Sequence, residues 1–317
     1  MMLSVRNVAL VVGLFAWLLT GSGCVKNAAT GDRFFSLYGG NRQAEIALGA
    51  QAAPGMANEF GGAVASPALQ AFVRDIGSRL AAVTEADNPG LPWEFTLLDS
   101  AVINAFALPG GKVYITRGLC ERMSNEAQLA GVLGHEVGHV TAQHTMRRIG
   151  QQQLVTAGVV ASSVAVAAAD REGGTAQTIV PALSIGGSLV LLKFGRDEES
   201  QADTLGMRYM SRIGYNPRGQ LQVMEILRDA SGGSRQIEFL ATHPLPETRI
   251  QRVSAQLAGE FKPAVDDPNN QLHEERFQRQ FLAALRQLPP PTQTSEARVE
   301  ALMRLAQVCG PACGHAH

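Results

Sequence analysis

Five consecutive residues near the middle of the chain, His135-Glu136-Val137-Gly138-His139, constrain its fold more than any other feature. Residues four apart on an α-helix lie one turn apart on the same face, so His135 and His139 can direct two imidazole nitrogens at one point. That spacing suits a tetrahedral zinc ion, and Glu136 beside it can accept a proton from a water molecule. With seven histidines and 28 acidic residues in 317, such a pattern arises by chance on the order of 0.01 times. The segment therefore predicts a helix that carries two metal ligands and a general base.

A catalytic zinc site needs a third protein ligand and one open position, and this ligand must come from another element. Residues 195–206 read as the start of a helix that places Glu199 and Asp203 on one face. Glu199 could bind the metal while Asp203 accepts the outer N–H of a ligating histidine. On chemistry alone Glu198 could replace Glu199, and the acidic run could equally be a solvated helix face.

His144 lies five residues after His139, which is about 140° further round a continuous helix. The helix is expected to run from near Ser124 to about Ile149, so His144 should face away from the metal. We therefore expect His144 to be structural and the third ligand to be a carboxylate.

The remaining periodicity predicts a mainly helical α+β fold with a small antiparallel sheet. A proline-glycine turn at residues 109–111 is expected to form a hairpin between two of its strands. Two apolar runs, 154–169 and 179–194, are shorter than the ~20 residues of a membrane span and predict a helical hairpin on the domain or at a lipid surface. Helices are expected at Asn41–Phe60, Pro67–Val83, near Gln271–Leu288 and at Glu296–Val308, and strands at Trp93–Leu97, Val102–Leu108 and Val113–Thr116.

The first residues have the layout of a secretory signal. Arg6 supplies the positive charge, an apolar run spans residues 8–19, and small residues lead into Cys24. Cysteine at that position resembles the lipidation site of a bacterial lipoprotein, although Gly21 stands where such signals usually carry leucine. Lipidation of Cys24 is the favoured interpretation; ordinary cleavage near Gly23 and an uncleaved anchor are the alternatives.

Four motifs in order resemble the Ste24/HtpX/Oma1-type zinc metallopeptidases, particularly their bacterial periplasmic and lipoprotein members. The motifs are the segment 126–140 around HEVGH, residues 104–111, the Glu199-x-x-x-Asp203 segment and residues 242–250. The resemblance covers roughly residues 40–258 and implies a zincin-like fold of the gluzincin type with one Zn²⁺ per chain. It also implies that Glu199, rather than Glu198, is the third ligand and that Asp203 supports a histidine.

The resemblance implies further roles near the metal. The sheet's edge strand would line the active site and pair with an extended peptide through Asn104, Ala105, Phe106 and Ala107. His243 and Arg249 resemble a pair placed over the metal, able to donate to a developing oxyanion. His243 could equally displace the catalytic water at rest and act as a latch.

These inferences divide the chain into a signal peptide (1–23), a tether (24–40), a zinc metallopeptidase domain (41–260) and a C-terminal helical tail (261–317). No 34-residue repeat follows the peptidase domain, so the helical-repeat domain of some relatives is not expected. A net charge of −1 gives no case for nucleic acid binding. Cys309 and Cys313 could form a small disulfide loop, or they could form an accessory surface metal site with the terminal His315 and His317.

The functional hypothesis is a zinc endopeptidase on the periplasmic side of the cell envelope, lipid-anchored to the outer membrane. Its substrates would be unfolded or misassembled envelope proteins, in a quality-control role implied by the resemblance alone. One alternative is an envelope assembly factor or chaperone with a latched zinc site, and another is a zinc hydrolase of cell-wall peptide links. Glu136 argues against a purely structural site, because such a site needs no general base.

Overall fold

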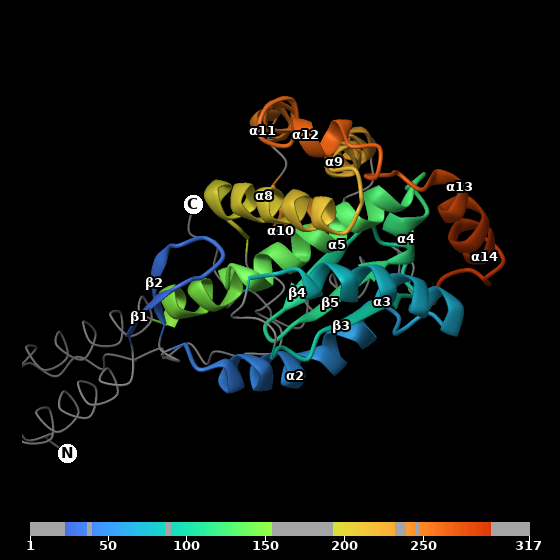
Figure 1. Ribbon diagram of the computed structural model, residues 1–317. Helices are drawn as coiled ribbons and strands as arrows, with labels where there is room; N and C mark the ends of the chain where they lie inside the picture. The colour runs from blue at the N-terminus through green and yellow to red at the C-terminus, as the bar shows by residue number, and fades with distance from the viewer. Residues whose placement is uncertain are drawn as a thin grey trace, which may run out of the picture.

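The computed structural model describes residues 23–36, 40–85, 90–153, 193–231, 239–244 and 247–292. One helix, α5 (Glu126–Thr141), runs through the centre of the molecule, and all its residues are buried (Figure 1). The side chain of Asn125 caps it by accepting a hydrogen bond from the Gln128 backbone N–H, one residue after the expected cap at Ser124. The other main helices are α2 (Arg42–Glu59), α3 (Pro67–Ala82), α8 (Arg196–Arg212), α9 (Arg218–Ser231) and α11 (Glu247–Ala258).

The three-stranded sheet is mixed, with strand order β3-β5-β4. Strands β4 (Ala105–Leu108) and β5 (Lys112–Thr116) form the predicted antiparallel hairpin, whose turn needs the positive φ angles of Gly110 and Gly111. The prediction of a wholly antiparallel sheet is wrong, because β3 (Glu94–Leu98) pairs with β5 in parallel. In sequence, β4 lies between β3 and β5. No local turn therefore joins the two parallel strands or sets their relative direction.

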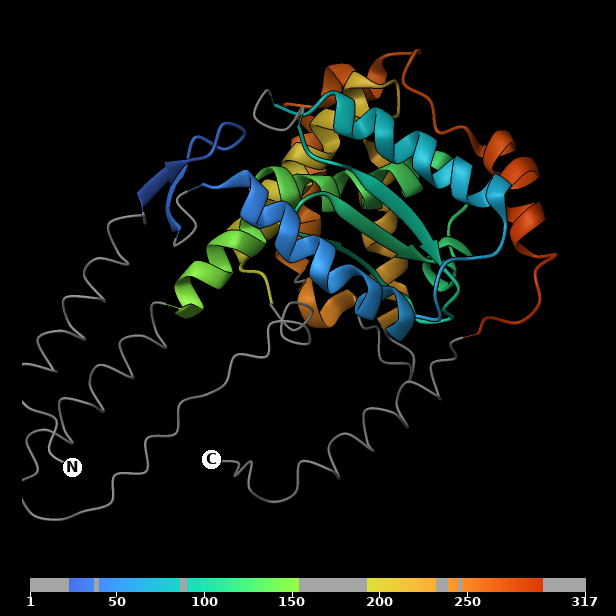
Figure 2. The same ribbon diagram turned by 90° about the horizontal axis from the view of Figure 1, so that it is seen from below.

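Helices lie on both sides of the sheet (Figure 2), and alternating residues of its strands face the two sides. One face packs Phe106 and Tyr114 against Met56 and Phe60 at the end of α2. The other face belongs to the main core with α3 and α5, and its buried strand residues are Phe95, Leu97, Ala105, Val113 and Ile115. The sheet thus holds α5 from one side and leaves β4 as an edge strand beside it.

On its other side, α5 packs against α8 with almost no side chains between the two backbones. A Cβ atom added at Gly138 would lie 2.9 Å from the carbonyl oxygen and 3.1 Å from the Cα of Ala202. Glycine therefore lets the two helices that carry the motif residues approach more closely than an alanine would permit.

Gly138→Ala is expected to lower the free energy of unfolding by about 1–3 kcal/mol, because the new methyl group forces α8 away from α5. Urea unfolding of the metal-free protein measures this effect. The matched control is Gly55→Ala in α2, where an added Cβ meets nothing within 4 Å. There the same substitution should raise helix stability by up to ~1 kcal/mol, so equal losses in both variants would contradict this account of the helix contact.

The predicted tether contains a hairpin of its own, with strands β1 (Gly23–Lys26) and β2 (Arg33–Ser36). Its turn is stabilised by the Asn27 side chain, whose Oδ1 accepts hydrogen bonds from the backbone N–H groups of Ala29 and Thr30. Gly31 follows with a positive φ of 75°. We call residues 23–36 the N-terminal hairpin; it lies at the C-terminal end of α5 (Figures 1 and 2).

The helix that carries HEVGH ends at Thr141 rather than continuing to about Ile149. Asn27 Nδ2 donates to the Thr141 carbonyl oxygen at 2.8 Å, which satisfies one of the last acceptors of α5. Gln143 then adopts a left-handed conformation with φ of 57°, and residues 144–153 form a separate helical segment. The break changes the direction of every side chain that follows it, including His144.

After α11 the chain continues through α12 (Lys262–Asp266), α13 (Glu274–Arg276), a π-helical turn (Phe277–Leu282) and α14 (Ala283–Leu285). The predicted helix near 271–288 is thus observed as residues 274–285. Phe277 and Phe281 are fully buried in the main core, which therefore extends past the predicted boundary at residue 260. The expected helix at 296–308 and the apolar run 154–169 lie outside the described residues, as does most of 179–194. In the part of the chain that is described, no helix combines the length and hydropathy required to cross a bilayer.

Candidate metal centre and active site

Four buried side chains from three separate elements converge at the middle of the molecule. His135 and His139 come from α5, Glu199 from the first turn of α8, and His243 from the residue after α10 (Phe239–Thr242). One ligand atom from each residue lies within 4.8 Å of every other. The predicted ligands are therefore brought together, and His243 joins them as a fourth group.

The spacing of these atoms fits a zinc ion. Ligands about 2.0–2.1 Å from a tetrahedral zinc lie roughly 3.3 Å from one another. His139 Nε2 lies 3.0 Å from His135 Nε2 and 3.3 Å from Glu199 Oε1. His243 Nδ1 lies 3.4 Å from His135 Nε2 and 2.9 Å from Glu199 Oε1. Three imidazoles and a carboxylate that lie so close together in a buried site favour a bound cation, to which each can donate a lone pair.

Glu198 and Glu199 are placed differently, which separates the two candidates for third ligand. Glu198 accepts a hydrogen bond at 2.9 Å from Arg148 Nε and another at 2.8 Å from the Gly195 backbone N–H, so it caps α8. Glu199 instead faces the two histidines, and its Oε2 is ion-paired with the Arg249 guanidinium. The positive charges of His243 and Arg249 outweigh its burial and hold the pKa of Glu199 well below its usual range.

Asp203 and Arg249 support the centre from behind. Asp203 Oδ1 lies 2.9 Å from His135 Nδ1, the ring nitrogen that faces away from the other ligands. Arg249 donates to both carboxylate oxygens of Asp203 at 2.7 Å, and it also contacts Glu199. It also donates to the Pro244 carbonyl oxygen at 3.2 Å, and its Nη2 lies 3.4 Å from His135 Nδ1. These contacts are those of a positioning residue, and the oxyanion role of Arg249 stays a prediction.

His144 lies against His139, contrary to the expectation that it would face away. Its Nδ1 is 2.9 Å from His139 Nδ1, and its Nε2 is 3.0 Å from Gln201 Oε1. Burial lowers the pKa of His144 to about 4, so the ring is neutral near pH 7. The sequence argument missed this contact because it assumed an unbroken helix, whereas the left-handed Gln143 turns His144 back toward the metal centre.

Glu136 stands beside the four groups rather than among them. It is 1 % exposed, and its Oε1 has no hydrogen-bond partner in the described part of the chain. The nearest cationic partner is His243, whose Nε2 lies 3.7 Å away. Burial raises the pKa of Glu136 above its usual value, which makes the carboxylate a stronger base than an exposed glutamate.

His243 closes the centre on the side opposite α5. Its ring stacks on Phe239 at a centroid distance of 4.5 Å, and its backbone N–H donates to the Phe239 carbonyl oxygen at 2.9 Å. Burial alone would lower the pKa of His243, but Glu199 and Glu136 outweigh it and raise the pKa. The ring therefore sits between the third ligand and the predicted base.

The predicted substrate strand begins beside this centre. The Thr116 backbone N–H donates to the Asn104 carbonyl oxygen at 3.1 Å, so the first pairing of the hairpin uses that residue. In an antiparallel pair the direction of the backbone groups alternates, which turns those of Ala105 and Ala107 toward the open edge. The Asn104 side-chain oxygen is also buried without a hydrogen-bond partner among described residues.

The residues of this centre all lie within one stretch of recognisable sequence. Residues 67–257 match the family described as Peptidase family M48. The chain belongs to this family. The protein is thus an M48 zinc metallopeptidase. Its metal-binding group consists of His135, His139, Glu199 and His243.

Several curated proteins are similar to part of the chain. The beta-barrel assembly-enhancing protease of Escherichia coli K12 is 35 % identical over 189 residues, which are 58 % of this chain and 38 % of that protein. The protein of the same name from Yersinia pestis is 32 % identical over 62 % of this chain and 40 % of its own length. The mitochondrial metalloendopeptidase OMA1 of Schizosaccharomyces pombe is 31 % identical over 57 % and 51 %. The chain thus spans between about two fifths and one half of these relatives.

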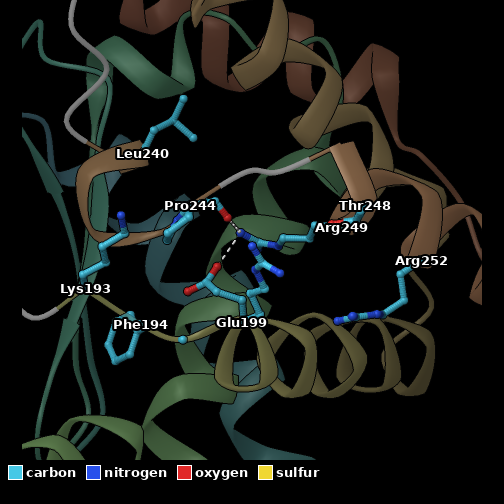
Figure 3. Close-up of a pocket in the computed structure, with 10 residues that line it drawn as sticks. Lys193, Phe194, Glu199, Leu240, Pro244, Thr248, Arg249 and Arg252 are labelled. Carbon is cyan, nitrogen blue, oxygen red and sulfur yellow. Dashed lines mark hydrogen bonds and ion pairs between the residues drawn. The ribbon is translucent and has the colours of Figure 1, made fainter.

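A pocket of about 510 Å³ opens next to the M48 metal-binding group, with Glu199 in its wall (Figure 3). Phe194 and Leu240 supply apolar surface, and Arg249 lies at its inner side. Three further basic side chains also line the pocket, namely Lys193, Arg196 and Arg252. Arg252 extends toward the pocket from α11 (Figure 3).

Some predicted site residues lie where the structure gives no side-chain detail. Cys24 is in β1 and pairs with Phe35 in the backbone register, but its side chain is not described. Cys309, Cys313, His315 and His317 lie outside the described residues. Lipidation of Cys24 and the role of the terminal cluster therefore stay predictions.

Proposed function

We propose that this M48 peptidase is a zinc-dependent endopeptidase that cleaves unfolded or misassembled proteins of the bacterial cell envelope. The observation that carries the proposal is the combination of four ligand atoms at zinc spacing with the buried Glu136 carboxylate beside them, whose Oε1 has no hydrogen-bond partner among the described residues. A structural metal site would not need Glu136, which makes a hydrolytic site the better explanation.

The chain's own residues divide the chemistry between them. Zinc, when bound, would polarise the scissile carbonyl and lower the pKa of a water molecule. Glu136 accepts the proton of that water as it attacks and then passes the proton to the leaving amine. Asp203 fixes the ring of His135, while Arg249 holds Asp203 and Glu199 in place.

An extended polypeptide is the form of substrate that the edge strand favours. Ala105 and Ala107 offer backbone donors and acceptors to a new strand, and pairing of this kind depends little on the substrate's sequence. The Asn104 side-chain oxygen could accept one further N–H of the bound peptide. A segment must be unfolded to pair in this way, which agrees with a role in protein quality control.

The proposed location is the periplasmic side of the envelope, with lipid on Cys24 holding the chain at the outer membrane. The name of the E. coli and Y. pestis relatives, beta-barrel assembly-enhancing protease, supports an envelope setting. Two alternatives to the proposed endopeptidase activity remain to be tested. One is an envelope assembly factor or chaperone with a latched zinc site, and the other is a zinc hydrolase of cell-wall peptide links.

The deciding experiment incubates the purified, zinc-loaded chain with reduced casein and, in parallel, with cell-wall peptides. Cleavage of casein that stops with a zinc chelator and returns with added zinc supports the endopeptidase. Release of cell-wall fragments without casein cleavage favours the cell-wall rival. If neither substrate is cut, even by a variant in which His243 is replaced, the assembly-factor reading replaces the proposal.

His243→Ala is expected to raise casein cleavage severalfold, because the ring fills the space between Glu199 and Glu136 where water and the peptide carbonyl must enter. Zinc content should stay near one per chain, since three protein ligands remain. The control is the double variant with Glu136→Gln, which should cleave nothing. A loss of activity in His243→Ala with full zinc content would instead favour the oxyanion role.

Cys24→Ala is expected to move the protein from the membrane to the soluble fraction after cell lysis, because acyl chains are the proposed anchor. Metabolic labelling with a fatty-acid analogue should mark the parent chain and not the variant. Unchanged membrane fractionation together with unlabelled parent protein would point to the uncleaved anchor.

A further inference from the structure

The second zinc ligand is connected to the N-terminal hairpin by an unbroken series of polar contacts. His139 Nδ1 lies 2.9 Å from His144 Nδ1, and His144 Nε2 lies 3.0 Å from Gln201 Oε1. Gln201 Nε2 donates to Asp32 Oδ2 at 2.7 Å. His139 is 2 % exposed and His144 is fully buried, so water does not compete with the inner contacts.

Only one arrangement of protons satisfies all three contacts. His139 uses its Nε2 toward the metal, so its proton must be on Nδ1, and His144 must accept that proton's hydrogen bond with a bare Nδ1. The proton of neutral His144 is then on Nε2, and it points at the Gln201 oxygen. The Gln201 amide is thereby turned with its NH₂ group toward Asp32, which can only accept. A carboxylate at the far end thus fixes the direction of every hydrogen bond in the series.

The hairpin that carries Asp32 is itself fastened to the helix that carries the ligands. Asn27 Nδ2 donates to the last carbonyl of α5, that of Thr141. The Arg147 guanidinium lies 5.3 Å from the Phe34 ring centroid and 3.4 Å from Asp32 Oδ2. The hairpin therefore cannot shift without changing the position of Asp32 relative to Gln201.

We propose that the N-terminal hairpin is part of the metal centre, and that Asp32, Gln201 and His144 are positioning residues that set the tautomer and ring orientation of His139. The opposite ligand, His135, has its own carboxylate partner in Asp203. For His139, the hydrogen bonds through His144 and Gln201 to Asp32 supply the equivalent support. Asp32 belongs to a segment that precedes the family-matched residues 67–257 in sequence. Support of this kind typically changes metal affinity by 10- to 100-fold.

The test compares the zinc dissociation constants of full-length variants by chelator competition. His144→Phe, which keeps the ring and removes the acceptor, should weaken zinc binding by about 10- to 100-fold. Asp32→Leu should weaken it by about two- to tenfold, the effect of one hydrogen bond. Asp32→Asn keeps an acceptor and should recover part of the loss. Arg33→Ala, the next residue on the hairpin and exposed, is the control and should bind zinc as the parent does.

A spectroscopic measurement separates positioning from a loss of folding. In ¹⁵N-histidine spectra of the zinc-loaded parent, His144 should be the Nε2–H tautomer and His139 the Nδ1–H tautomer. Gln201→Leu, at a half-buried site, should weaken zinc binding without a change in the melting temperature of the metal-free protein. Parent-like zinc affinity in His144→Phe and Gln201→Leu, or a proton on His144 Nδ1, would overturn the proposal.

The pocket beside Glu199 carries a second, independent inference about substrate choice. Lys193, Arg196 and Arg252 line it, and none forms an ion pair with a described residue. Arg249 at its inner side is already neutralised by Asp203 and Glu199. The pocket therefore holds an excess of positive charge next to the metal-binding group.

We infer that this pocket receives an acidic side chain of the substrate close to the cleaved bond, an inference that rests on the proposed function. An apolar wall of Phe194 and Leu240 suits the methylene groups of glutamate, and the cations suit its carboxylate. Interactions with exposed cations are weak individually, so the expected preference is about three- to tenfold in kcat/KM for glutamate over glutamine.

Peptides that differ only by glutamate or glutamine at each position around one cleavage site test this preference. Arg252→Gln should reduce the glutamate-to-glutamine ratio of kcat/KM toward one, and high salt should do the same. Arg218→Gln, the same charge change at an exposed site outside the pocket, should leave the ratio intact. Equal cleavage of all pairs by the parent would overturn this inference alone, whereas no cleavage of any peptide would count against the proposed function.

Discussion

Glu136→Gln is expected to lower kcat for casein cleavage by about 10²- to 10⁴-fold, the usual contribution of a general base. The amide has nearly the volume of the carboxylate but cannot accept the proton of the attacking water. Glu136 is not one of the four metal-binding residues, so zinc content should stay near one per chain. Its Oε1 makes no hydrogen bond with a described residue, and the substitution should therefore leave the fold intact.

Zinc analysis and casein cleavage from one preparation measure both effects. Glu260→Gln, the same change at an exposed site, is the control and should cleave casein as the parent does. A variant that holds zinc and still cleaves casein at the parent's rate would mean that another group is the base, and His243 would be the next to test. A variant that loses zinc would show that Glu136 contributes to metal binding.

Glu199→Ala is expected to reduce zinc content from one per chain to a small fraction, because it removes one of three ligands that come from α5 and α8. Among the described residues, its loss also leaves the buried Arg249 with Asp203 as the one remaining carboxylate partner. An unpaired buried charge costs about 3–5 kcal/mol, and Asp203 should limit the actual loss to the lower part of that range. Zinc content and urea unfolding of the metal-free variant test the two effects separately.

Glu198→Ala is the matched control for this prediction, since it removes the neighbouring carboxylate from the same helical turn. It should lose the Arg148 ion pair and the cap at Gly195, and thus some stability, but it should keep its zinc. If Glu198→Ala lost zinc and Glu199→Ala kept it, the assignment of the third ligand would have to be exchanged.

The sequence predicted the metal centre well because helical periodicity converts residue spacing directly into geometry. His135 and His139 needed only the four-residue repeat of α5, and the contact between Asp203 and His135 follows the same repeat on α8. The helices 42–59 and 67–82 were likewise predictable from their caps, Asn41 and Ser66. From the residues alone Glu198 stayed an alternative, because both carboxylates lie in the first turn of α8; the family resemblance favoured Glu199, and the packing agrees with it.

The features that the sequence did not reveal depend on contacts between distant segments. The parallel pairing of β3 with β5 joins strands that no local turn connects, so no local pattern in the sequence predicts it. Gln143 adopts a positive φ although it is not glycine, and its side chain donates to Glu45, nearly one hundred residues away. That single conformation places His144 against His139, so a periodicity argument could not have found it.

The close contact between α5 and α8 has a consequence for how such a protein can be controlled. Three of the four metal-binding residues belong to two helices whose backbones touch at Gly138 and Ala202, so their relative positions cannot vary much. The fourth, His243, directly follows the short helix α10 and belongs to neither of these two helices. If His243 acts as the proposed latch, occupancy by zinc and access by substrate are separate properties. A cell could store this protein fully loaded and inactive, and zinc content measured in an extract would not report how much of it is at work.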